Sequence, residues 1–281
     1  MKTGLIMEGG AMRGLYTAGV TDVMMEHNLK VDGAIGVSAG AVFGCNYKSH
    51  QPGRTIRYNL RFCRDPRYAS FRSLIKTGDL YGEQFCYHDI PETLDPFDTV
   101  TFQNSPMEFY VTCTDIRTGK PVYHKCETGG PEDLQWMRAS ASMPVVSRIV
   151  HIGNYALLDG GIADSIPIRY FESLGYTHNI VILTQPKGFV KQKNSMLPII
   201  RAALRSYPKA VQAVADRHIR YNETLDYIAA RERTGEILVM RPSKALEVGA
   251  REKDPEKLKA VYKLGRKDAL KRIKELETFC Q

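Results

Sequence analysis

Apolar and polar positions vary along this chain in a pattern that predicts short strands separated by helices. Compact apolar runs typical of buried strands occur at residues 3–7, 31–35, 109–113, 155–158, 180–184 and 237–240. Residues 39–47 and 210–233 are typical of helices, and residues 121–125 predict a small antiparallel addition. Strands that alternate with helices indicate an α/β fold with a mainly parallel central sheet and flanking crossover helices.

The last third of the sequence predicts a helical extension. Asp254 followed by Pro255 is a typical helix start, because proline is favoured at the first helical position. The apolar stripe that follows indicates core packing rather than a membrane anchor, and consists of Leu258, Val261, Tyr262, Ala269, Ile273 and Leu276. We expect a first domain over residues 1–186 and a mainly helical extension over residues 187–281 that packs on the same core and returns one strand at 237–241.

Composition narrows the setting of this fold. The chain has 281 residues, of which 43% are apolar, an ordinary value for a globular protein. No apolar run reaches the roughly 18 residues of a membrane-spanning helix, and Glu8 and Arg13 interrupt the first apolar stretch, which argues against a signal peptide. Six scattered cysteines without paired spacing indicate reduced thiols in a cytoplasmic compartment, and no Cys–His cluster indicates a metal.

The net charge of +8 is concentrated in one segment. Residues 48–76 contain eight lysines and arginines and only one acidic residue, Asp65. Four arginines recur at helical spacing among aromatic side chains: Arg54, Arg57, Arg61 and Arg64. This pattern predicts contact with a phosphate head group or peripheral contact with an anionic membrane. The alternative is a solvated helix face paired with acids elsewhere. No nucleic-acid reading motif accompanies the charge, so we expect no nucleic-acid partner.

The first chemical motif lies at residues 36–40, which read Gly-Val-Ser-Ala-Gly. Gly36, Ser38 and Gly40 have the spacing of a nucleophile elbow, a sharp strand-to-helix turn that exposes one serine hydroxyl. Ser38 is therefore the candidate covalent nucleophile. The alternative is an ordinary strand–loop–helix turn with two incidental glycines.

The second motif is a glycine-rich loop between the first predicted strand and a helix. It consists of Gly9, Gly10, Ala11, Met12, Arg13 and Gly14. Such a loop presents backbone N–H groups to an anion, which in acyl transfer is the oxyanion of the tetrahedral intermediate. A dinucleotide site is disfavoured, because Ala11 occupies the middle glycine position of the Rossmann pattern.

The third motif is Asp159, Gly160 and Gly161 at the end of an apolar run. A structural aspartate in a turn is common, but with Ser38 present Asp159 becomes the candidate base. A Ser–His–Asp triad stays open on composition, since His178 or His218 follows Asp159. We interpret both histidines as surface or packing residues, with His178 in a loop before the strand that starts at 180.

In this order the three motifs resemble the patatin-like phospholipase family. Residues 111–115 and 138–144 are further family-like stretches, and the resemblance covers about residues 3–185. It implies a three-layer α/β sandwich in which Ser38 and Asp159 form a catalytic dyad without a metal or cofactor. The N–H groups around Gly9, Gly10 and Ala11 would hold the oxyanion, and Arg13 occupies the family's arginine position.

Two positions depart from the family pattern. Ala11 replaces the usual third glycine, and Glu8 replaces a common aspartate. The Cβ of Ala11 restricts φ, which predicts a narrower or less well aligned oxyanion hole. We expect the segment 48–105 to cover the active site.

The resulting hypothesis is a serine acyl hydrolase that cleaves carboxylic esters of phospholipids or lysophospholipids through an acyl-serine intermediate. A transacylase that uses the same dyad is one alternative. The other alternative is a catalytically weak lipid-binding protein, for which the Ala11 departure is the argument.

Overall fold

The computed structural model describes residues 2–281 and places eight strands in one mixed sheet. The strands are β1 (Lys2–Met7), β2 (Gly33–Val37), β3 (Glu108–Asp115), β4 (Lys120–Cys126), β5 (Val150–Ile152), β6 (Tyr155–Asp159), β7 (Tyr176–Ile182) and β8 (Ile237–Met240). Their order is β5-β6-β3-β2-β1-β7-β8, with β4 paired to β3 outside this path. The strands from β3 through β8 in that order are parallel, while β4, β5 and β6 add antiparallel pairs.

Strand β3 has three neighbours but only two edges, and this arrangement positions the site. Strand β4 pairs with β3 from residue 109 to residue 115 and therefore occupies one edge. Strands β2 and β6 must share the other edge: Val37 pairs with Thr112, and Asp159 pairs with Cys113. The ends of β2 and β6 thus meet at two adjacent residues of β3.

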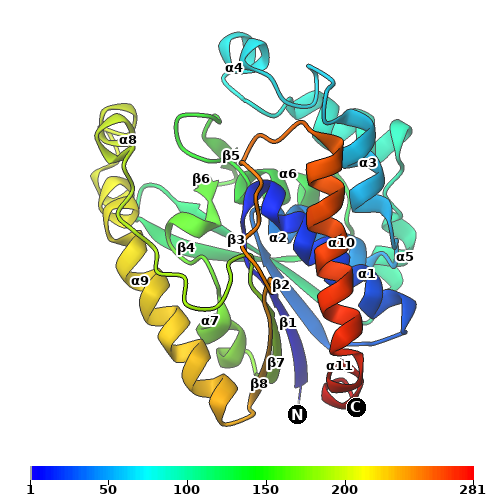
Figure 1. Cartoon of the computed structure of the whole chain (residues 1–281). Coiled ribbons are helices and arrows are strands. Elements are labelled where there is room, and N and C mark those ends of the chain that lie inside the picture. The colour runs from blue at the N-terminus through cyan, green and yellow to red at the C-terminus, as the bar shows by residue number, and fades with distance from the viewer. Residues whose placement is uncertain (1) are drawn as a thin grey trace.

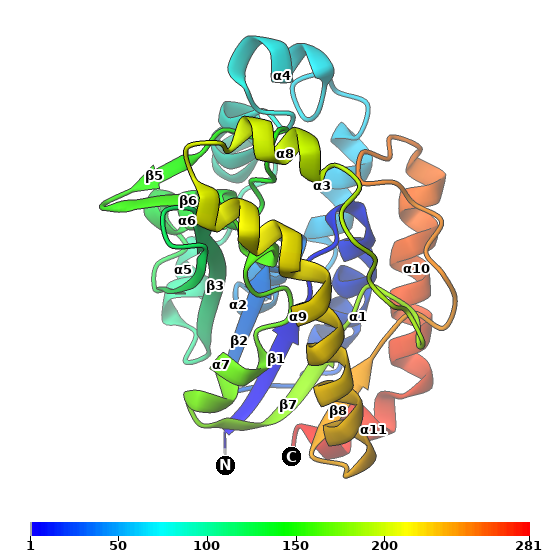
Figure 2. The same ribbon diagram turned by 90° about the vertical axis from the view of Figure 1, so that its left-hand side faces the viewer.

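Helices cover both faces of this sheet, which gives three layers (Figure 1). The helices are α1 (Gly14–Glu26), α2 (Ala39–Lys48), α3 (Arg54–Phe62), α4 (Phe71–Thr77), α5 (Thr99–Asn104), α6 (Pro131–Ser140), α7 (Ile168–Ser173), α8 (Leu197–Ala203), α9 (Pro208–Arg233), α10 (Pro255–Lys271) and α11 (Ile273–Phe279). Residues 85–94 form a π-helical segment. Helices α1, α2 and α10 lie on one face, and α7 and α9 on the other; in Figure 2, α9 crosses in front of the sheet.

The alternation of side chains along the strands builds a core on each face. Leu5 and Met7 of β1 pack into the cluster that includes α1 and α2, whereas Ile6 packs into the cluster with α7 and α9. Successive side chains of a strand point to opposite faces, and a sheet covered on both sides reads as a continuous apolar run. This explains why β1 and β7 were visible in the sequence as apolar runs without alternation.

The C-terminal segment adds to both outer layers and to the sheet. Strand β8 pairs with β7 at the sheet edge, and α10 packs closely on α1. A Cβ on Gly265 would lie 2.1 Å from the carbonyl oxygen of Tyr16, so the two helix backbones touch at this glycine. The side chain of Asp254 caps α10 by accepting a hydrogen bond from the N–H of Glu256 at 3.0 Å.

Two details of the predicted elements are wrong. His178 lies inside β7 and not in a loop, because parallel pairing with β1 extends the strand back to Tyr176. The apolar stripe of the C-terminal helix runs over two helices, because α10 ends at Lys271 and α11 begins at Ile273. The stripe nevertheless packs into the core as predicted, with Leu258 and Leu276 fully buried.

Candidate active site

Ser38 occupies a strained turn between β2 and α2. Its φ of 54° and ψ of −122° are rare for a residue with a side chain. The turn is tight because α2 begins at once, with the amides of Ala41 and Val42 donating to the Ser38 carbonyl oxygen. Gly40 is required here, since a Cβ would lie 2.3 Å from the carbonyl oxygen of Met7. The structure therefore has the strand–turn–helix context that a nucleophile elbow needs, with Gly36 buried in β2.

Helix α6 supports the elbow from below. The N–H of Ser38 donates to Ser140 Oγ at 2.8 Å, and that hydroxyl donates to the carbonyl oxygen of Thr112 at 2.6 Å. Ser140 thus connects Ser38 to the residue of β3 that pairs with the end of β2. The family-like stretch at residues 138–144 therefore has a structural role in fixing the serine backbone.

Asp159 ends β6 and is 2% exposed. Its Oδ1 accepts a hydrogen bond from the N–H of Gly161 at 2.7 Å, while Oδ2 is buried and has no hydrogen-bond partner within residues 2–281. Its carbonyl oxygen accepts from Thr114 Oγ1 at 2.9 Å, and Gly160 and Gly161 begin a short 3₁₀ turn. One carboxylate oxygen is therefore held in place, and the other stays available for a proton.

Burial raises the pKa of Asp159 above its usual range, whereas Arg217, the Ser38 hydroxyl and the Gly161 N–H each lower it. The Ser38 hydroxyl is therefore near enough to the carboxylate to affect its pKa, although no hydrogen bond joins the two side chains in this structure. Catalytic hydrogen bonds are often long without substrate. A carboxylate with a raised pKa is a better proton acceptor for a serine than an ordinary aspartate.

The glycine-rich loop lies between β1 and α1 as predicted, next to the elbow. The amides of Gly9, Gly10 and Ala11 donate to no acceptor in the described part of the chain. The amide of Ala39, at the start of α2, is likewise without an acceptor there, as expected for the first residue of a helix. These unpaired N–H groups could bind an anion. Met12 is buried, and Gly14 begins α1.

Ala11, which stands where the family usually has glycine, adopts the left-handed backbone conformation. Its φ is 49°, a region that favours glycine because the Cβ of other residues meets the following carbonyl. The chain therefore retains the loop conformation at a cost in backbone strain. The predicted narrowing of the oxyanion hole stays a prediction.

Glu8 anchors this loop to two other elements. Its Oε2 accepts from the Thr184 N–H at 2.6 Å and from Thr184 Oγ1 at 3.1 Å, and its Oε1 accepts from the Tyr221 hydroxyl at 2.5 Å. The longer glutamate side chain thus reaches both the end of β7 and helix α9. Glu8 is 3% exposed, and these bonds satisfy both of its carboxylate oxygens.

An apolar cavity of about 180 Å³ opens beside Ser38. Its walls come from α2, α3, α6 and the π-helical segment, and include Val42, Phe43, Tyr58, Ile90 and Met137. Tyr58 is buried, and burial raises its pKa, so its hydroxyl stays protonated. The cavity could hold the apolar part of a substrate.

The segment expected to cover the site does line the cavity, and the C-terminal loop joins it. Leu80 and Tyr81 of the segment 48–105 line the cavity, and Ala250 and Arg251 line it from the loop before α10. The Tyr81 hydroxyl donates to the Ala250 carbonyl oxygen at 3.1 Å, and the Arg251 guanidinium lies 4.5 Å from the Phe71 ring centroid. The sequence had no signal for the second contribution, because these residues are distant in the chain and belong to an unpatterned loop.

None of the seven histidines, all within the described residues, lines the cavity. His178 stacks on Phe279, with ring centroids 3.6 Å apart, near the end of the sheet where β1 begins. His218 bonds to the Ala215 carbonyl oxygen within α9. Neither is placed to complete a triad with Ser38.

Of the four arginines expected to contact lipid or a head group, Arg54 does not lie on an exposed helix face but lines the cavity. Its side chain is buried and donates to the Asp95 carbonyl oxygen at 2.6 Å and to Asn46 Oδ1 at 3.0 Å. Arg57 forms a bidentate pair with the Asp95 carboxylate, and Arg61 bonds to the Leu94 carbonyl oxygen. Helical spacing alone did not reveal that the face of α3 bearing these arginines packs on the segment around Asp95. Arg64 stays exposed.

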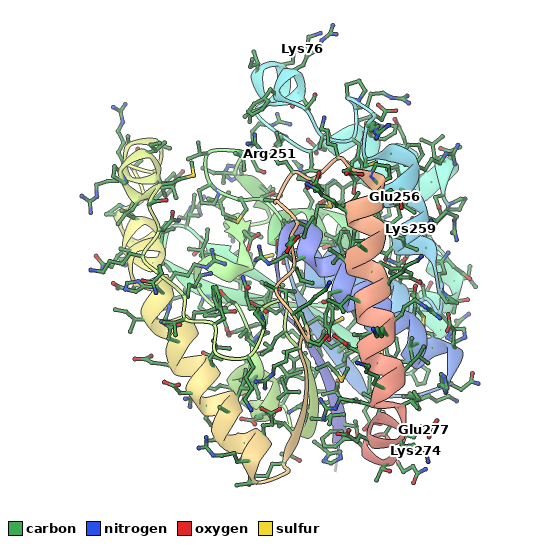
Figure 3. The ribbon with its side chains drawn as sticks, viewed as in Figure 1. Lys76, Arg251, Glu256, Lys259, Lys274 and Glu277 are labelled. Carbon is green, nitrogen blue, oxygen red and sulfur yellow. The ribbon has the colours of Figure 1, made fainter. Side chains whose placement is uncertain are left out.

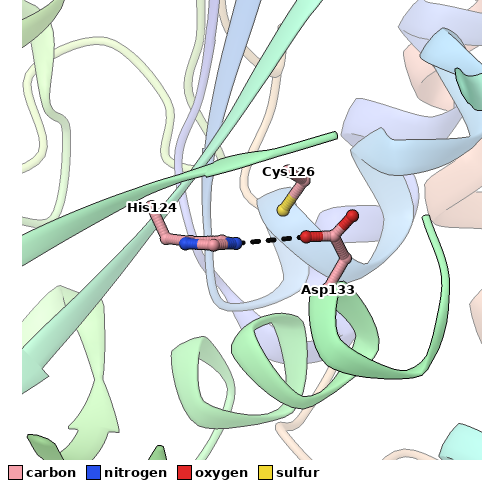
Figure 4. Close-up of side chains that lie close together, drawn as sticks. All are labelled: His124, Cys126 and Asp133. Atoms are coloured by element: carbon pink, nitrogen blue, oxygen red, sulfur yellow. Dashed lines mark hydrogen bonds and ion pairs between the residues drawn. The ribbon is translucent and has the colours of Figure 1, made fainter. Parts of the chain in front are cut away.

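His124, Cys126 and Asp133 form a cluster that sequence spacing did not indicate (Figure 4). Their donor atoms lie within 4.8 Å of one another. However, Asp133 already accepts hydrogen bonds from His124 at 3.1 Å and from the N–H groups of Thr128 and Gly129. Burial raises the pKa of the Cys126 thiol well above its usual value, which disfavours the thiolate that a metal requires. The cluster therefore stabilises the turn before α6, and a metal could bind there only with loss of these hydrogen bonds.

All six cysteines are free thiols, and within residues 2–281 no helix combines the length and apolar character needed to span a membrane.

Comparison with known families places this geometry in context. The family model described as patatin-like phospholipase matches residues 5–172, and a domain of unknown function, DUF6363, matches residues 207–281. The first match contains Ser38, Asp159 and the glycine loop. The second contains α9, β8 and α10.

Curated relatives are similar over the same region. An uncharacterized protein of Escherichia coli K12, YjjU, is 27% identical over 195 residues, which are 65% of this chain and 52% of that protein. Neuropathy target esterase of Drosophila melanogaster is 25% identical over 64% of this chain and 12% of its own length. A lysophospholipase of Aspergillus fumigatus is 27% identical over 61% of this chain and 11% of its own length. The chain thus spans about half or less of these relatives.

Among solved structures, VipD from Legionella pneumophila aligns with a TM-score of 0.50 at 12% identity, over 99% of this chain and 67% of that one. This likeness concerns the fold alone. The family match over more than half of the chain agrees with the elbow, the loop and the Asp-Gly-Gly turn described above. The chain therefore belongs to the patatin-like phospholipase family.

Proposed function

We propose that this chain is a serine acyl hydrolase that cleaves carboxylic esters of phospholipids or lysophospholipids through Ser38 and Asp159. Family membership supports lipid hydrolysis, and relatives named lysophospholipases support the lipid class. The observation that carries the proposal is that the Ser38 elbow and Asp159 meet at adjacent residues of β3, beside an apolar cavity.

The reaction follows from the groups at this point. Ser38 Oγ attacks the ester carbonyl carbon while its proton passes to Asp159. The developing oxyanion accepts hydrogen bonds from the loop amides around Gly10 and Ala11, each worth about 2.7–4 kcal/mol in comparable sites. The alcohol leaves with the proton from Asp159, and the acyl group stays on Ser38. Water then loses a proton to Asp159, attacks the acyl carbon and releases the fatty acid, and the proton returns to Ser38.

The size and lining of the cavity indicate which part of such a substrate it can hold. Pockets that enclose a whole small ligand occupy about 300–1,000 Å³, and this cavity holds about 180 Å³. Its lining is mostly apolar, and its guanidinium at Arg54 is already bonded to Asn46 and Asp95. The cavity therefore suits part of an acyl chain and leaves a polar head group outside it.

The decisive experiment is labelling with a fluorophosphonate probe, followed by intact mass. We expect a single adduct on the wild type and none on Ser38→Ala. Asp159→Asn keeps the shape of the site but removes the base, so its labelling rate should fall on the order of a hundredfold or more. Absence of an adduct on the wild type, with or without lipid vesicles, would favour the lipid-binding alternative. Products formed with glycerol present separate hydrolysis from transacylation.

We further propose that the end of the molecule bearing α4 and α8 contacts an anionic membrane. Helix α4 buries none of its residues: Phe71 is 62% and Ile75 is 85% exposed. Ile199 of α8 is 55% exposed. Figure 1 places both helices at one end of the molecule, and Figure 3 shows Lys76 projecting outward from α4 there. Exposed apolar side chains beside cations match the interfacial and charged layers of an anionic bilayer.

Vesicle sedimentation tests this surface. Ile75→Asp should weaken binding to phosphatidylglycerol-containing vesicles on the order of tenfold. It replaces an apolar side chain that would insert into the bilayer with a carboxylate that the anionic lipid repels. The matched control is Val100→Asp, at a 68% exposed position on α5 away from this end. Equal losses in both variants, or equal binding to neutral vesicles at every salt concentration, would contradict the proposed surface.

A further inference from the structure

Three cations gather behind the glycine loop without an ion-pair partner. They are Arg13 of the loop, Lys191 of the segment between β7 and α8, and Arg217 of α9. All three are partly buried, and none forms an ion pair with a carboxylate among residues 2–281. We call these three side chains the cation cluster.

Arg217 reaches the turn that carries the catalytic aspartate. Its Nε donates to Ser165 Oγ at 3.3 Å, and Ser165 Oγ donates to the Gly161 carbonyl oxygen at 2.8 Å. A Cβ on Gly161 would lie 2.9 Å from Arg217 Nη2 and 3.0 Å from Asp159 Oδ1. The guanidinium therefore lies beside the Asp159 carboxylate without bonding to it, and part of its donor capacity is unused.

Lys191 is held in place by contacts on both its backbone and its side chain. Its N–H donates to Asn222 Oδ1 at 2.9 Å, and its carbonyl oxygen accepts from Asn222 Nδ2 at 3.1 Å. Its ammonium lies 4.6 Å from the ring centroid of Tyr221. Burial, together with Arg217 and Arg13, lowers the pKa of Lys191 to about 8. The lysine is thus fixed next to like charges in a partly desolvated place.

Arg13 brings the third charge from the loop itself. Its Nε is buried and has no hydrogen-bond partner in the described chain. The acids that face the cluster are Glu8 and Asp159. Both oxygens of Glu8 bond to Thr184 and Tyr221, and Asp159 Oδ1 bonds to Gly161. The cations therefore have donors left over, a costly arrangement unless an anion occupies the space between them.

We propose that Arg13, Lys191 and Arg217 bind a phosphate group beside the catalytic dyad. Cationic donors that arrive from a loop, a connecting segment and a helix suit the tetrahedral oxygens of a phosphate better than the two coplanar oxygens of a carboxylate. The group is either the head-group phosphate of the lipid or free phosphate. The first source rests on the function proposed above.

The position of the cluster supports the first source. The walls of the acyl cavity come from α2, α3 and α6 on one side of the sheet, whereas Arg217 comes from α9 on the other (Figure 1, Figure 2). A phospholipid whose carboxylic ester lies at Ser38 would then place its acyl chain in the cavity and its head-group phosphate at the cluster. This arrangement assigns the choice of head group to the C-terminal segment.

Binding is tested first without any substrate. The melting temperature of the whole chain is measured against inorganic phosphate, with chloride at matched ionic strength as the reference. We expect phosphate to raise it for the wild type and for Lys193→Met, an exposed control on the same segment, and to lose this effect in Lys191→Met. Equal phosphate stabilisation of Lys191→Met and wild type would overturn the proposal.

Kinetics then identify the source of the phosphate. Hydrolysis of a lysophosphatidylcholine is compared with that of a monoacylglycerol of the same acyl chain. If the head group is the ligand, Lys191→Met should lower the ratio of the two kcat/KM values on the order of tenfold, mainly through KM for the phospholipid. An unchanged ratio with intact phosphate stabilisation of the wild type assigns the site to free phosphate. If neither ester is hydrolysed, the proposed function fails while the melting experiment still decides the site.

Discussion

Backbone strain at Ser38 is the clearest sign of function at the scale of single residues. A side chain at φ 54° and ψ −122° costs about 1–3 kcal/mol and persists only where the surroundings enforce it. The amide bonds of α2 and the bond from Ser140 provide that enforcement. Strain of this kind exposes a hydroxyl at the price of stability.

The strain predicts a difference between two inactive variants. Ser38→Gly should be more stable than Ser38→Ala by about 1 kcal/mol, because glycine adopts this conformation without a Cβ clash while both variants lose the same hydroxyl. Urea unfolding followed by the fluorescence of the single tryptophan, Trp136, measures the difference. If Ser38→Ala proves as stable as Ser38→Gly, the turn carries no such strain.

The raised pKa of Asp159 predicts the acid limb of the pH profile. The base must be ionised, so kcat/KM should fall as the pH drops through a pKa above the usual aspartate value of about 3.9. Arg217 lowers this pKa, so Arg217→Gln should move the limb to higher pH. The control is Arg64→Gln, at an exposed position just beyond α3, which should leave the limb in place. A limb that stays put in Arg217→Gln would exclude the charge effect.

The same shift bears on stability. A carboxyl whose folded-state pKa is raised stabilises the fold fully only below the unfolded pKa, and this contribution is lost as the pH rises through the folded value. At neutral pH the ionised Asp159 therefore destabilises the fold. The Asp159→Asn variant, which we expect to be inactive, should thus be at least as stable as the wild type. Residues that serve activity often lower the stability of the fold in this way.

At the scale of elements, α3 is fixed by a buried arginine rather than exposed on a membrane. Arg54 and Arg57 both bond to Asp95, and Arg54 is 4% exposed. The guanidinium satisfies carbonyl oxygens of the segment that forms part of the cavity wall. This ties the cover of the site to α3.

This anchoring predicts a large loss of stability in one variant and none in its neighbour. Arg54→Met should lower the free energy of unfolding by about 3 kcal/mol, since it leaves buried acceptors without a donor. Arg64→Met, on the exposed part beyond α3, should change it by less than about 0.5 kcal/mol. Urea unfolding compares the two. Similar small effects would mean that Arg54 is not part of the packed structure.

The elements also divide what could be predicted from what could not. The sequence predicted residues 36–40 and the loop at Gly9 because tight turns restrict which residues fit. It predicted β1 and β7 because strands buried on both faces need unbroken apolar runs. The burial of Arg54 was not legible, since an arginine that bonds to distant carbonyl oxygens has the same local pattern as one in water. The same holds for Arg217 and Arg251, which reach the site only through the tertiary fold.

At the scale of the whole molecule, the C-terminal segment is integrated into the family domain and does not hang from it. Its strand β8 extends the sheet, its helix α9 brings Arg217 to the Asp-Gly-Gly turn, and the loop before α10 brings Arg251 to the cavity. The close approach of α10 to α1 at Gly265 holds this segment on the core.

That approach predicts the effect of a single methyl-bearing side chain. Gly265→Val should lower the free energy of unfolding by about 2–3 kcal/mol, because the added atoms force the two helices apart, although valine favours a helix more than glycine does. Gly249→Val is the control, since nothing lies within 4 Å of a Cβ there. Differential scanning calorimetry would contradict the packing if the two variants melted together.

The sheet, and not the walls of the cavity, sets the distance between Ser38 and Asp159. Val37 and Asp159 pair with neighbouring residues of one central strand, so a single peptide unit of β3 sets the spacing between Ser38 and Asp159, the proposed nucleophile and base. Movements of the covering helices, or exchanges of residues along the cavity, need not alter that spacing. Substitutions in the cavity wall can therefore change the substrate preference while the distance between the two proposed catalytic residues stays the same.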